Sequence, residues 1–398
     1  MNADANHPAR AGGSDAASEG PALFRPFNLG RLTLDNRIVV SPMCQYSADD
    51  GRANDWHLSH LVSMGLSGAS LVMIEATAVE RLGRITHGCL GLYDEGCETA
   101  LARVLAACRK YTRAKYGIQI GHAGRKGSAH VPWKGGAALG SSDQPWETAA
   151  PSALPFTAGW HTPKALDRDG LTRVRDAFVA AAQRALRLDI EVVELHGAHG
   201  YLLHEFFSPI SNTREDAYGG SRENRMRFPL EVAQAVREVW PAGRPLGMRI
   251  SGSDWMDGGA TVEDAVVFAE KLKALGLDYV CVSSGGIDPK ARIAVGPGYQ
   301  VAFAREVKRR TGIATRAVGM IVEPKQAESV IASGDADLVA FARAILDDPR
   351  WGWHAADILG GEVKYAPQYD RVHPTVWPGS RLARPGAPGP KKVAWQPR

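Results

Sequence analysis

The chain lacks the features that mark membrane, secreted and metal-cluster proteins. No window approaches about 18 uncharged apolar residues, and residues 1–20 hold no hydrophobic run of the kind a secretory signal needs. The cysteine count is low and odd, with no C-x-x-C pair, which argues against zinc or iron–sulfur ligation: Cys44, Cys89, Cys97, Cys108 and Cys281. This usage fits a reducing compartment, so we expect a cytoplasmic protein with no metal site.

An excess of one charge is also lacking. Lys and Arg number 47 against 43 Asp and Glu, and the small surplus is spread along the chain instead of forming a basic stripe. Nucleic acid and membrane surfaces are therefore not expected as partners. The remaining composition, 44% hydrophobic and 23% charged, is that of a globular protein with enough apolar material for a large core.

Short β-branched runs alternate with helical stretches from Leu23 to about Gly361, as in parallel strands joined by crossover helices. We count eight such runs: Arg37–Ser41, Ser70–Ala76, Tyr116–Gly121, Asp189–Leu195, Pro245–Ile250, Asp278–Ser283, Ala314–Val318 and Ala336–Phe341. Eight strand–helix units predict an α/β fold, a single-domain (β/α)8 TIM barrel over residues 23–362 with an N-terminal hairpin. We expect residues 1–22 to be a disordered extension and 363–398 to form a C-terminal tail.

An open doubly wound sheet is the structural alternative. It would place G-x-G-x-x-G after the first strand, and neither this motif nor G-x-x-x-x-G-K-[ST] occurs there. Helix ends fit the strand–helix pattern, with a capping box at Thr261–Asp264, Gly276 after the last apolar residue of one helix and Pro324 near the start of another. The Gly-, Pro-, Ser- and Trp-rich segment 125–169 after the third strand predicts a lid-like excursion over the catalytic face.

Residues just after each strand are the ones to inspect, because strand exits build the active site of such barrels. After the fourth strand, His196-x-x-His199-x-Tyr201 could direct two imidazoles at one carbonyl oxygen while a phenol supplies a proton. Two histidines could instead ligate a metal, although no third ligand is evident, or simply satisfy backbone carbonyls in a Gly-rich turn. Tyrosine has an unperturbed pKa of about 10, so Tyr201 suits an acid better than a base.

Other strand exits carry polar side chains suited to an electron-rich ring. Arg249 and Lys126 could place positive charge there or act as ordinary ion-pair partners, and Gln119 can both donate and accept, as a pyrimidine edge requires. Gly319 and Arg343 follow the seventh and eighth strands, where such barrels bind phosphate. Cys44 could be a nucleophile or an inert buried thiol.

Together these stretches resemble the old yellow enzyme family, in particular its thermophilic-like subclass. The resemblance covers roughly residues 23–372 and rests on many ordered matches: Leu23–Phe27, Asn36–Ile38, Ser41–Cys44 with Tyr46, Glu75–Thr77, Gln119–Lys126, His196–Tyr201, Ser208-Pro209, Asn212, Tyr218–Gly220, Asn224-Arg225 and Gln368-Tyr369-x-Arg371. Ala342 departs from the glycine expected before the phosphate arginine. The chain also extends well past Arg371.

The resemblance implies an FMN-dependent ene-reductase that takes electrons from NADPH or NADH and reduces activated alkenes by ping-pong hydride transfer through flavin N5. It implies one set of FMN-binding residues: Ser41, Pro42, Met43, Cys44, Ala76, Gln119, Lys126, Arg249, Gly319, Ala342 and Arg343. His196 and His199 would grip the substrate oxygen, Tyr201 would give the proton, Tyr46 would line the substrate pocket and Cys44 would tune the flavin. Arg371 would reach the neighbouring active site of a homodimer or homotetramer.

Several other functions remain open from the residues alone. A barrel of the same kind could reduce nitro compounds or serve a catabolic pathway, a metal-dependent hydrolase could use His196 and His199 as ligands, and a flavin-binding protein could lack catalysis. A 2,4-dienoyl-CoA reductase is disfavoured because the chain lacks the extra flavin domain and a cysteine cluster. The colour of the protein and its response to NADPH separate these possibilities.

Overall fold

The computed structural model describes residues 20–383, and eight parallel strands within them close into a barrel. The strand order around the barrel is β10-β11-β12-β3-β4-β5-β8-β9. The bounds of these strands match the eight predicted runs to within three residues: β3 (Ile38–Val40), β4 (Leu71–Ala78), β5 (Lys115–Gly121), β8 (Val192–Gly197), β9 (Leu246–Ser251), β10 (Tyr279–Ser283), β11 (Ala314–Ala317) and β12 (Leu338–Phe341). The predicted TIM barrel is confirmed, and the doubly wound sheet was the wrong alternative.

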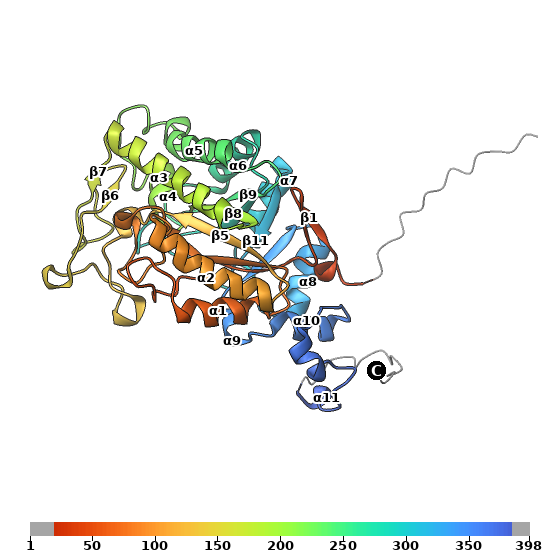
Figure 1. The fold of residues 1–398 in the computed structure, drawn as a ribbon. Coiled ribbons are helices and arrows are strands. Elements are labelled where there is room, and N and C mark those ends of the chain that lie inside the picture. Colours follow the sequence, from red (N-terminus) through yellow and green to blue (C-terminus); the bar gives the residue numbers. More distant parts are fainter. Residues whose placement is uncertain (1–19, 384–398) are drawn as a thin grey trace, which may run out of the picture.

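Helices surround the barrel as Figure 1 shows. Their bounds are α1 (Asp55–Gly65), α2 (Glu95–Tyr111), α3 (Arg168–Arg187), α4 (Leu202–Phe207), α5 (Arg222–Val239), α6 (Val262–Ala274), α7 (Val301–Thr311), α8 (Pro324–Ala332), α9 (Arg343–Asp347), α10 (Trp351–Leu359) and α11 (Ser380–Ala383). The predicted helix ends are confirmed, since Thr261 and Asp264 form a capping box on α6, Gly276 follows it with φ +82° and Pro324 begins α8. Within residues 20–383 no helix is long and apolar enough to cross a membrane.

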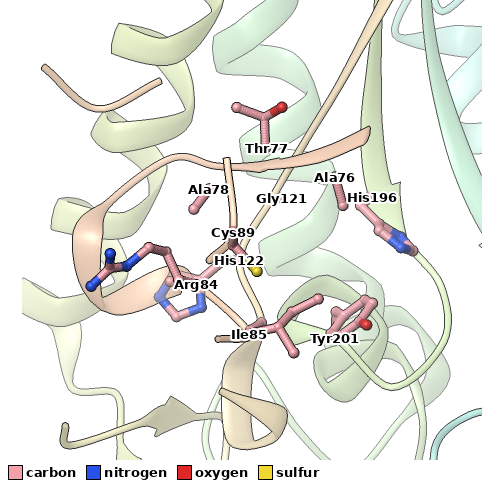
Figure 2. A pocket seen from close by; sticks show the side chains of 12 residues that line it. Ala76, Thr77, Ala78, Arg84, Ile85, Cys89, Gly121, His122, His196 and Tyr201 are labelled. Carbon is pink, nitrogen blue, oxygen red and sulfur yellow. The ribbon is translucent and has the colours of Figure 1, made fainter. Parts of the chain in front are cut away.

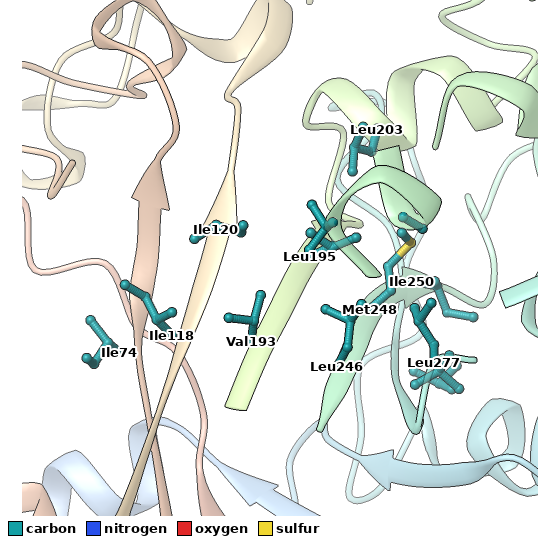
Figure 3. Close-up of a cluster of buried hydrophobic side chains, with 14 of the residues drawn as sticks. Ile74, Ile118, Ile120, Val193, Leu195, Leu203, Leu246, Met248, Ile250 and Leu277 are labelled. Atoms are coloured by element: carbon teal, nitrogen blue, oxygen red, sulfur yellow. The ribbon is translucent and has the colours of Figure 1, made fainter. Parts of the chain in front are cut away.

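The barrel strands alternate between two environments. Side chains such as Ile118, Val193 and Met248 face outward into the main core against the helices (Figure 3). Inward positions at the lower end of the barrel, where the strands begin, form a second, smaller core that includes Leu71 and Leu338. Alternation of this kind leaves the upper inward positions free for polar side chains, which is where the candidate site lies.

The predicted N-terminal hairpin is present as β1 (Phe27–Leu29) and β2 (Leu32–Leu34), paired antiparallel. Leu29 and Leu34 are fully buried in the lower barrel core, so the hairpin closes the end opposite the site. Most of the extension predicted to be disordered, residues 1–19, lies outside the described residues. Ala22 already begins a 3-10 turn, and its N–H donates to Glu328 Oε1 at 2.8 Å.

The long excursion after β5 crosses the catalytic face, as predicted. It contains the two-residue strands β6 (Ala149–Ala150) and β7 (Lys164–Ala165) and lies at the end of the barrel away from the tail (Figure 1). Trp133 makes an edge contact with the ring of Tyr46, with 6.0 Å between centroids, and the Phe156 ring lies 4.8 Å from Lys126 Nζ. The excursion therefore contributes aromatic surface to the mouth of the barrel.

The C-terminal tail packs on α10 before it leaves the barrel. Trp353 stacks on Tyr365 with centroids 4.0 Å apart, and the Arg350 guanidinium lies 5.2 Å from the Tyr369 ring. Arg371 lies beyond these contacts, in the 3-10 helix η6 (Pro367–Val372), and is exposed. Figure 1 places this part of the tail on the far side of the barrel from β6 and β7.

We predict that Gly247→Ala destabilises the barrel. A Cβ at Gly247 would lie 2.3 Å from Cε1 of Tyr279, whose ring occupies the space beside this fully buried strand. Overpacking of this kind costs about 1–3 kcal/mol. The urea midpoint of the variant should fall at an unchanged slope, whereas Gly243→Ala, with no atom within 4 Å of the added Cβ, should behave like the wild type. An unchanged midpoint for Gly247→Ala would contradict the proposed packing.

Candidate active site

Polar side chains from four strands meet at the upper end of the barrel. Parallel pairing places His196 on β8 beside Arg249 on β9. The Arg249 guanidinium reaches Ser41 Oγ, after β3, at 3.4 Å and Ser283 Oγ, at the end of β10, at 3.2 Å. Because these strands are far apart in sequence, closure of the barrel is what brings their exits together.

The predicted cluster of His196, His199 and Tyr201 is formed by one Gly-rich turn. The His196 ring lies 5.1 Å from the His199 ring and 4.9 Å from the Tyr201 ring, edge-on in both cases. The turn is tight because His199 has φ +61° and Gly200 has φ +73°. His196 and Tyr201 face a small, largely apolar cavity of about 20 Å³, shown in Figure 2, which Ile85 and Cys89 also line.

Burial sets the protonation states of this cluster. It lowers the pKa values of His196 and His199 well below the usual range, and the positive charge of Arg249 adds to the effect. Burial raises the pKa of the Tyr201 phenol well above its usual value. At neutral pH the site therefore holds two neutral imidazoles, which can donate hydrogen bonds, and a phenol that keeps its proton.

Cys44 lies close to Tyr46 and to the buried carboxyl of Glu75. Burial raises the pKa of the Cys44 thiol well above its usual value, and Glu75 raises it further. Glu75 is fixed in turn, since its Oε2 accepts the Gln45 N–H at 2.9 Å and its Oε1 lies 3.4 Å from His57 Nε2. Because the thiolate is the nucleophilic form, this environment opposes a nucleophilic role for Cys44.

Lys126 reaches the cluster from the segment after β5. Its Nζ donates to the carbonyl oxygens of His199, at 2.8 Å, and Gly286, at 2.9 Å, and lies 5.1 Å from the Tyr201 ring. Burial lowers the pKa of the lysine to about 8. The contact with the His199 carbonyl helps to hold the left-handed backbone of that turn.

A buried hydrogen-bond network beneath the site escaped the sequence analysis. Glu194, two residues before His196 on β8, accepts the amide N–H of Gln119 at 2.8 Å and the hydroxyl of Tyr279 at 3.0 Å. It also forms an ion pair with Arg316, and both side chains are fully buried. A charged residue within an apolar strand, on the same face as His196 by alternation, was the available clue.

The network fixes which way the Gln119 amide points. A carboxylate only accepts hydrogen bonds, so Gln119 must turn its nitrogen to Glu194 and leave its oxygen for another partner. A ring edge with an N–H, such as the pyrimidine part of a flavin, supplies a matching donor. The sequence predicted that Gln119 could both donate and accept hydrogen bonds. With one N–H bound to Glu194, its side chain offers the oxygen as an acceptor and one remaining N–H as a donor.

The other predicted cofactor residues lie around the same rim. Pro42, Met43 and Ala76 are half-buried next to Ser41 and Cys44, and Gly319 follows β11 with φ +117°. Ala342 and Arg343 follow β12, and Arg343 is exposed at the start of α9. The structure does not bring Arg371 to this cluster within the same chain, because Arg371 is part of η6, and this segment of the tail lies on the far side of the barrel from β6 and β7 (Figure 1).

These residues suit a bound flavin. The Nε of Arg249 is buried with no hydrogen-bond partner among the described residues, and a flavin ring offers acceptors for such a donor. Gly319 provides backbone that can approach a phosphate closely. Within residues 20–383 no group of three or more His, Cys, Asp or Glu side chains could hold a metal ion.

A barrel with this rim is the scaffold of a flavin-dependent oxidoreductase. Residues 22–359 match the model of the NADH:flavin oxidoreductase / NADH oxidase family. The chain is 44% identical over 351 residues to an NADPH dehydrogenase of Geobacillus sp. (strain WCH70), covering 88% of this chain and 98% of that protein. It is 42% identical over 352 residues to an NADPH dehydrogenase of Listeria innocua, with the same coverage.

Among solved structures, morphinone reductase aligns with a TM-score of 0.72 and 26% identity over 87% of this chain and 92% of that one. A complex of morphinone reductase with tetrahydroNAD aligns with a TM-score of 0.70 and 27% identity over the same shares. The chain belongs to the NADH:flavin oxidoreductase / NADH oxidase family. Its predicted resemblance to the old yellow enzymes is confirmed, and so is FMN as its cofactor.

Glu205, on α4, is a further buried group that the sequence analysis missed. Its Oε1 accepts the Arg125 N–H at 2.8 Å, and its Oε2 has no hydrogen-bond partner among the described residues. Burial raises the pKa of this carboxyl to about 8, although the charge of Arg125 acts in the opposite direction. The folded protein therefore keeps a proton on Glu205 at pH values where the unfolded chain has released it.

We predict that Glu205→Gln weakens the pH dependence of stability. A raised carboxyl pKa stabilises the fold fully below about pH 4.5, and this contribution is lost as pH rises through about 8. Relative to the wild type, the free energy of unfolding of the variant should rise by about 2–3 kcal/mol between pH 6 and 9. Urea unfolding at constant FMN measures this, with the exposed Glu223→Gln as the control. Parallel curves for Glu205→Gln and wild type would contradict the burial argument.

Proposed function

We propose that the protein is an NAD(P)H-dependent FMN ene-reductase that reduces the carbon–carbon double bond of α,β-unsaturated carbonyl or nitro compounds. The observation that carries the proposal is the meeting of two neutral imidazoles and a protonated phenol at the rim where Arg249, Ser41 and Gln119 lie. Hydrogen-bond donors of this kind stabilise negative charge that develops on a substrate oxygen. The names of the relatives support NADPH as the electron donor.

When bound, FMN would supply hydride transfer from the nicotinamide to the β-carbon of the alkene. His196 and His199 hold the substrate oxygen and polarise the double bond. Tyr201 gives its proton to the α-carbon from the other side, which suits a phenol whose pKa burial has raised. Tyr46 lines the substrate pocket, and Trp133 contacts its ring edge-on.

Cofactor contacts are divided among the strand exits. Gln119 and Arg249 bind the flavin ring, with Lys126 nearby, while Ser41, Pro42, Met43 and Ala76 line its edge. Gly319, Ala342 and Arg343 hold the phosphate. Cys44, which burial keeps as a thiol, adjusts the redox behaviour of the flavin.

An absorption spectrum of the purified protein tests the class directly. A flavin spectrum that bleaches on anaerobic titration with NADPH supports the proposal, and recovery of colour on adding cyclohexenone, maleimide or a nitroester ranks the substrates. A colourless protein inactivated by chelators would instead indicate the metal hydrolase. A yellow protein that NADPH does not bleach would indicate a non-catalytic flavin protein.

We predict that Tyr201→Phe slows alkene reduction about 100-fold or more, since positioned general acids contribute about 10²–10⁴ in rate. NADPH-driven bleaching needs no proton from Tyr201 and should change by no more than a few-fold. Anaerobic stopped-flow measures the two half-reactions separately. Tyr93→Phe, whose hydroxyl contacts only the Asp50 carbonyl at 2.9 Å among the hydrogen bonds described, is the control. Equal slowing of both half-reactions would remove Tyr201 from the proton-donor role.

We also propose that the protein is a homodimer or homotetramer in which Arg371 reaches the neighbouring active site. Its exposure on a tail that leaves the barrel away from the catalytic face supports action on a second chain. Arg371→Ala should raise the substrate KM about tenfold or more, the loss of one charged hydrogen bond.

Mixing tests this arrangement further. Subunits of Arg371→Ala combined with subunits of Tyr201→Phe regenerate sites that have both an intact tyrosine and an intact arginine. Alkene reduction should therefore rise above the level of either variant alone. Activity that stays at the average of the two would place Arg371 outside the neighbouring site.

A further inference from the structure

Ser283, at the carboxyl end of β10, is linked to both Arg249 and His199. Its hydroxyl oxygen lies 2.7 Å from His199 Nε2 and 3.2 Å from Arg249 Nη2. It also lies 3.4 Å from Gln300 Oε1. None of the roles proposed above involves this serine, although the contact at 2.7 Å uses one of the two ring nitrogens of a substrate-binding histidine.

The direction of each hydrogen bond follows from groups that can act in only one way. The Val318 carbonyl only accepts, so the Gln300 amide must donate to it from Nε2, at 3.0 Å, and turn Oε1 toward the two serines. The Ser284 hydroxyl already donates to that oxygen at 2.6 Å. The Ser283 hydroxyl is 3.4 Å from the same oxygen but 2.7 Å from His199 Nε2, so donation to Gln300 would be the weaker of its two possible hydrogen bonds.

Arg249 cannot accept a hydrogen bond, so it occupies a lone pair of Ser283 and leaves the hydroxyl hydrogen free. The acceptor at the shortest distance is His199 Nε2. A neutral imidazole carries one hydrogen, and if Nε2 accepts, that hydrogen is on Nδ1.

From this arrangement we infer that Ser283 is a positioning residue that selects the Nδ1–H tautomer of His199, so that His199 binds the substrate oxygen through Nδ1–H. His196 is held in the opposite tautomer, because its Nδ1 accepts the Ala198 N–H at 3.4 Å and its hydrogen is therefore on Nε2. The two imidazoles thus donate from different ring nitrogens to one oxygen. The inference rests on the proposed function for the identity of that oxygen, while the tautomer itself does not depend on it.

The backbone of His199 is held independently of its ring. Its N–H donates to Ser251 Oγ at 3.3 Å, and its carbonyl accepts from Lys126. Removal of the Ser283 hydroxyl therefore leaves the turn in place and takes away the group that chooses between tautomers, together with one hydrogen-bond acceptor of Arg249. This separation makes Ser283→Ala an informative variant.

Histidine-selective ¹⁵N NMR of the FMN-loaded protein tests the inference. In the wild type, His199 should show a protonated Nδ1 and an unprotonated Nε2. Ser283→Ala should lose this preference, and Ser283→Thr, which keeps a hydroxyl, should retain it. The dissociation constant of phenol, followed by its charge-transfer absorbance, should rise on the order of tenfold in Ser283→Ala and return toward the wild-type value in Ser283→Thr.

Ser70→Ala is the matched control, because Ser70 is a buried serine just before β4, at the opposite end of the barrel, and donates to the Asn36 carbonyl at 2.7 Å. It should leave the His199 spectrum and phenol binding unchanged. A wild-type His199 protonated on Nε2, or a Ser283→Ala spectrum that keeps the Nδ1–H pattern, would overturn the inference. Failure of the wild type to bleach with NADPH would instead overturn the proposed function, and the NMR result would stand apart from it.

Discussion

The carboxylate of Glu194 organises the interior of the barrel below the active site. It joins Gln119 on β5, Tyr279 on β10 and Arg316 on β11, so four strands are connected through one side chain. Gly247 lies between Glu194 and Tyr279 in the strand register and has no side chain, which lets the Tyr279 phenol cross β9. An apolar layer of similar volume could be equally stable, but it would not orient the neighbouring side chains through directed hydrogen bonds.

The active-site residues above this network require such an orientation. By strand alternation, His196 lies on the same face of β8 as Glu194, and Ser283 lies on the same face of β10 as Tyr279. The orientation of the Glu194 network therefore fixes the positions from which the site residues extend. Removing one partner of a buried ion pair typically costs about 3–5 kcal/mol, because the remaining charge is left without compensation. The Gln119 amide, which we propose binds the flavin ring, is thus held by a carboxylate that the fold cannot easily lose.

The sequence was sufficient to predict the strands and helices and the face of the barrel that carries the site. It was not sufficient to predict which side chains form hydrogen bonds with one another there. Strand runs, the hairpin and the His196–Tyr201 turn follow from local patterns, which alternation and Gly-rich spacing record directly. The partners of Gln119 and His199 are 75 and 84 residues away, and only the register of the closed barrel places them together. In the sequence, Ser283 is only the last residue of a predicted strand, and no pattern marks Glu205 as a buried carboxyl.

The protonation states of the site residues could not be predicted from the sequence either, because burial determines them. Cys44 and Tyr201 have unremarkable intrinsic pKa values, and the excursion over the barrel mouth and the surrounding strands are what remove them from water. The same burial raises the pKa of both acids and lowers those of the two histidines. Cys44, a possible nucleophile by its sequence position, is therefore kept as a thiol, and Tyr201 keeps its phenolic proton.

Backbone strain is concentrated at the same rim. Tyr46, His199 and Met320 all follow barrel strands and have φ of +50°, +61° and +47°, a region that costs a non-glycine residue roughly 1–2 kcal/mol. For His199 the compensation is visible, because Lys126 binds its carbonyl and Ser251 its N–H. A left-handed residue there turns the chain sharply enough for the rings of His196 and Tyr201 to meet. The strained backbone at His199 thus helps to place Tyr201, the proton donor that we propose, and the buried Lys126 is part of what holds that backbone in place.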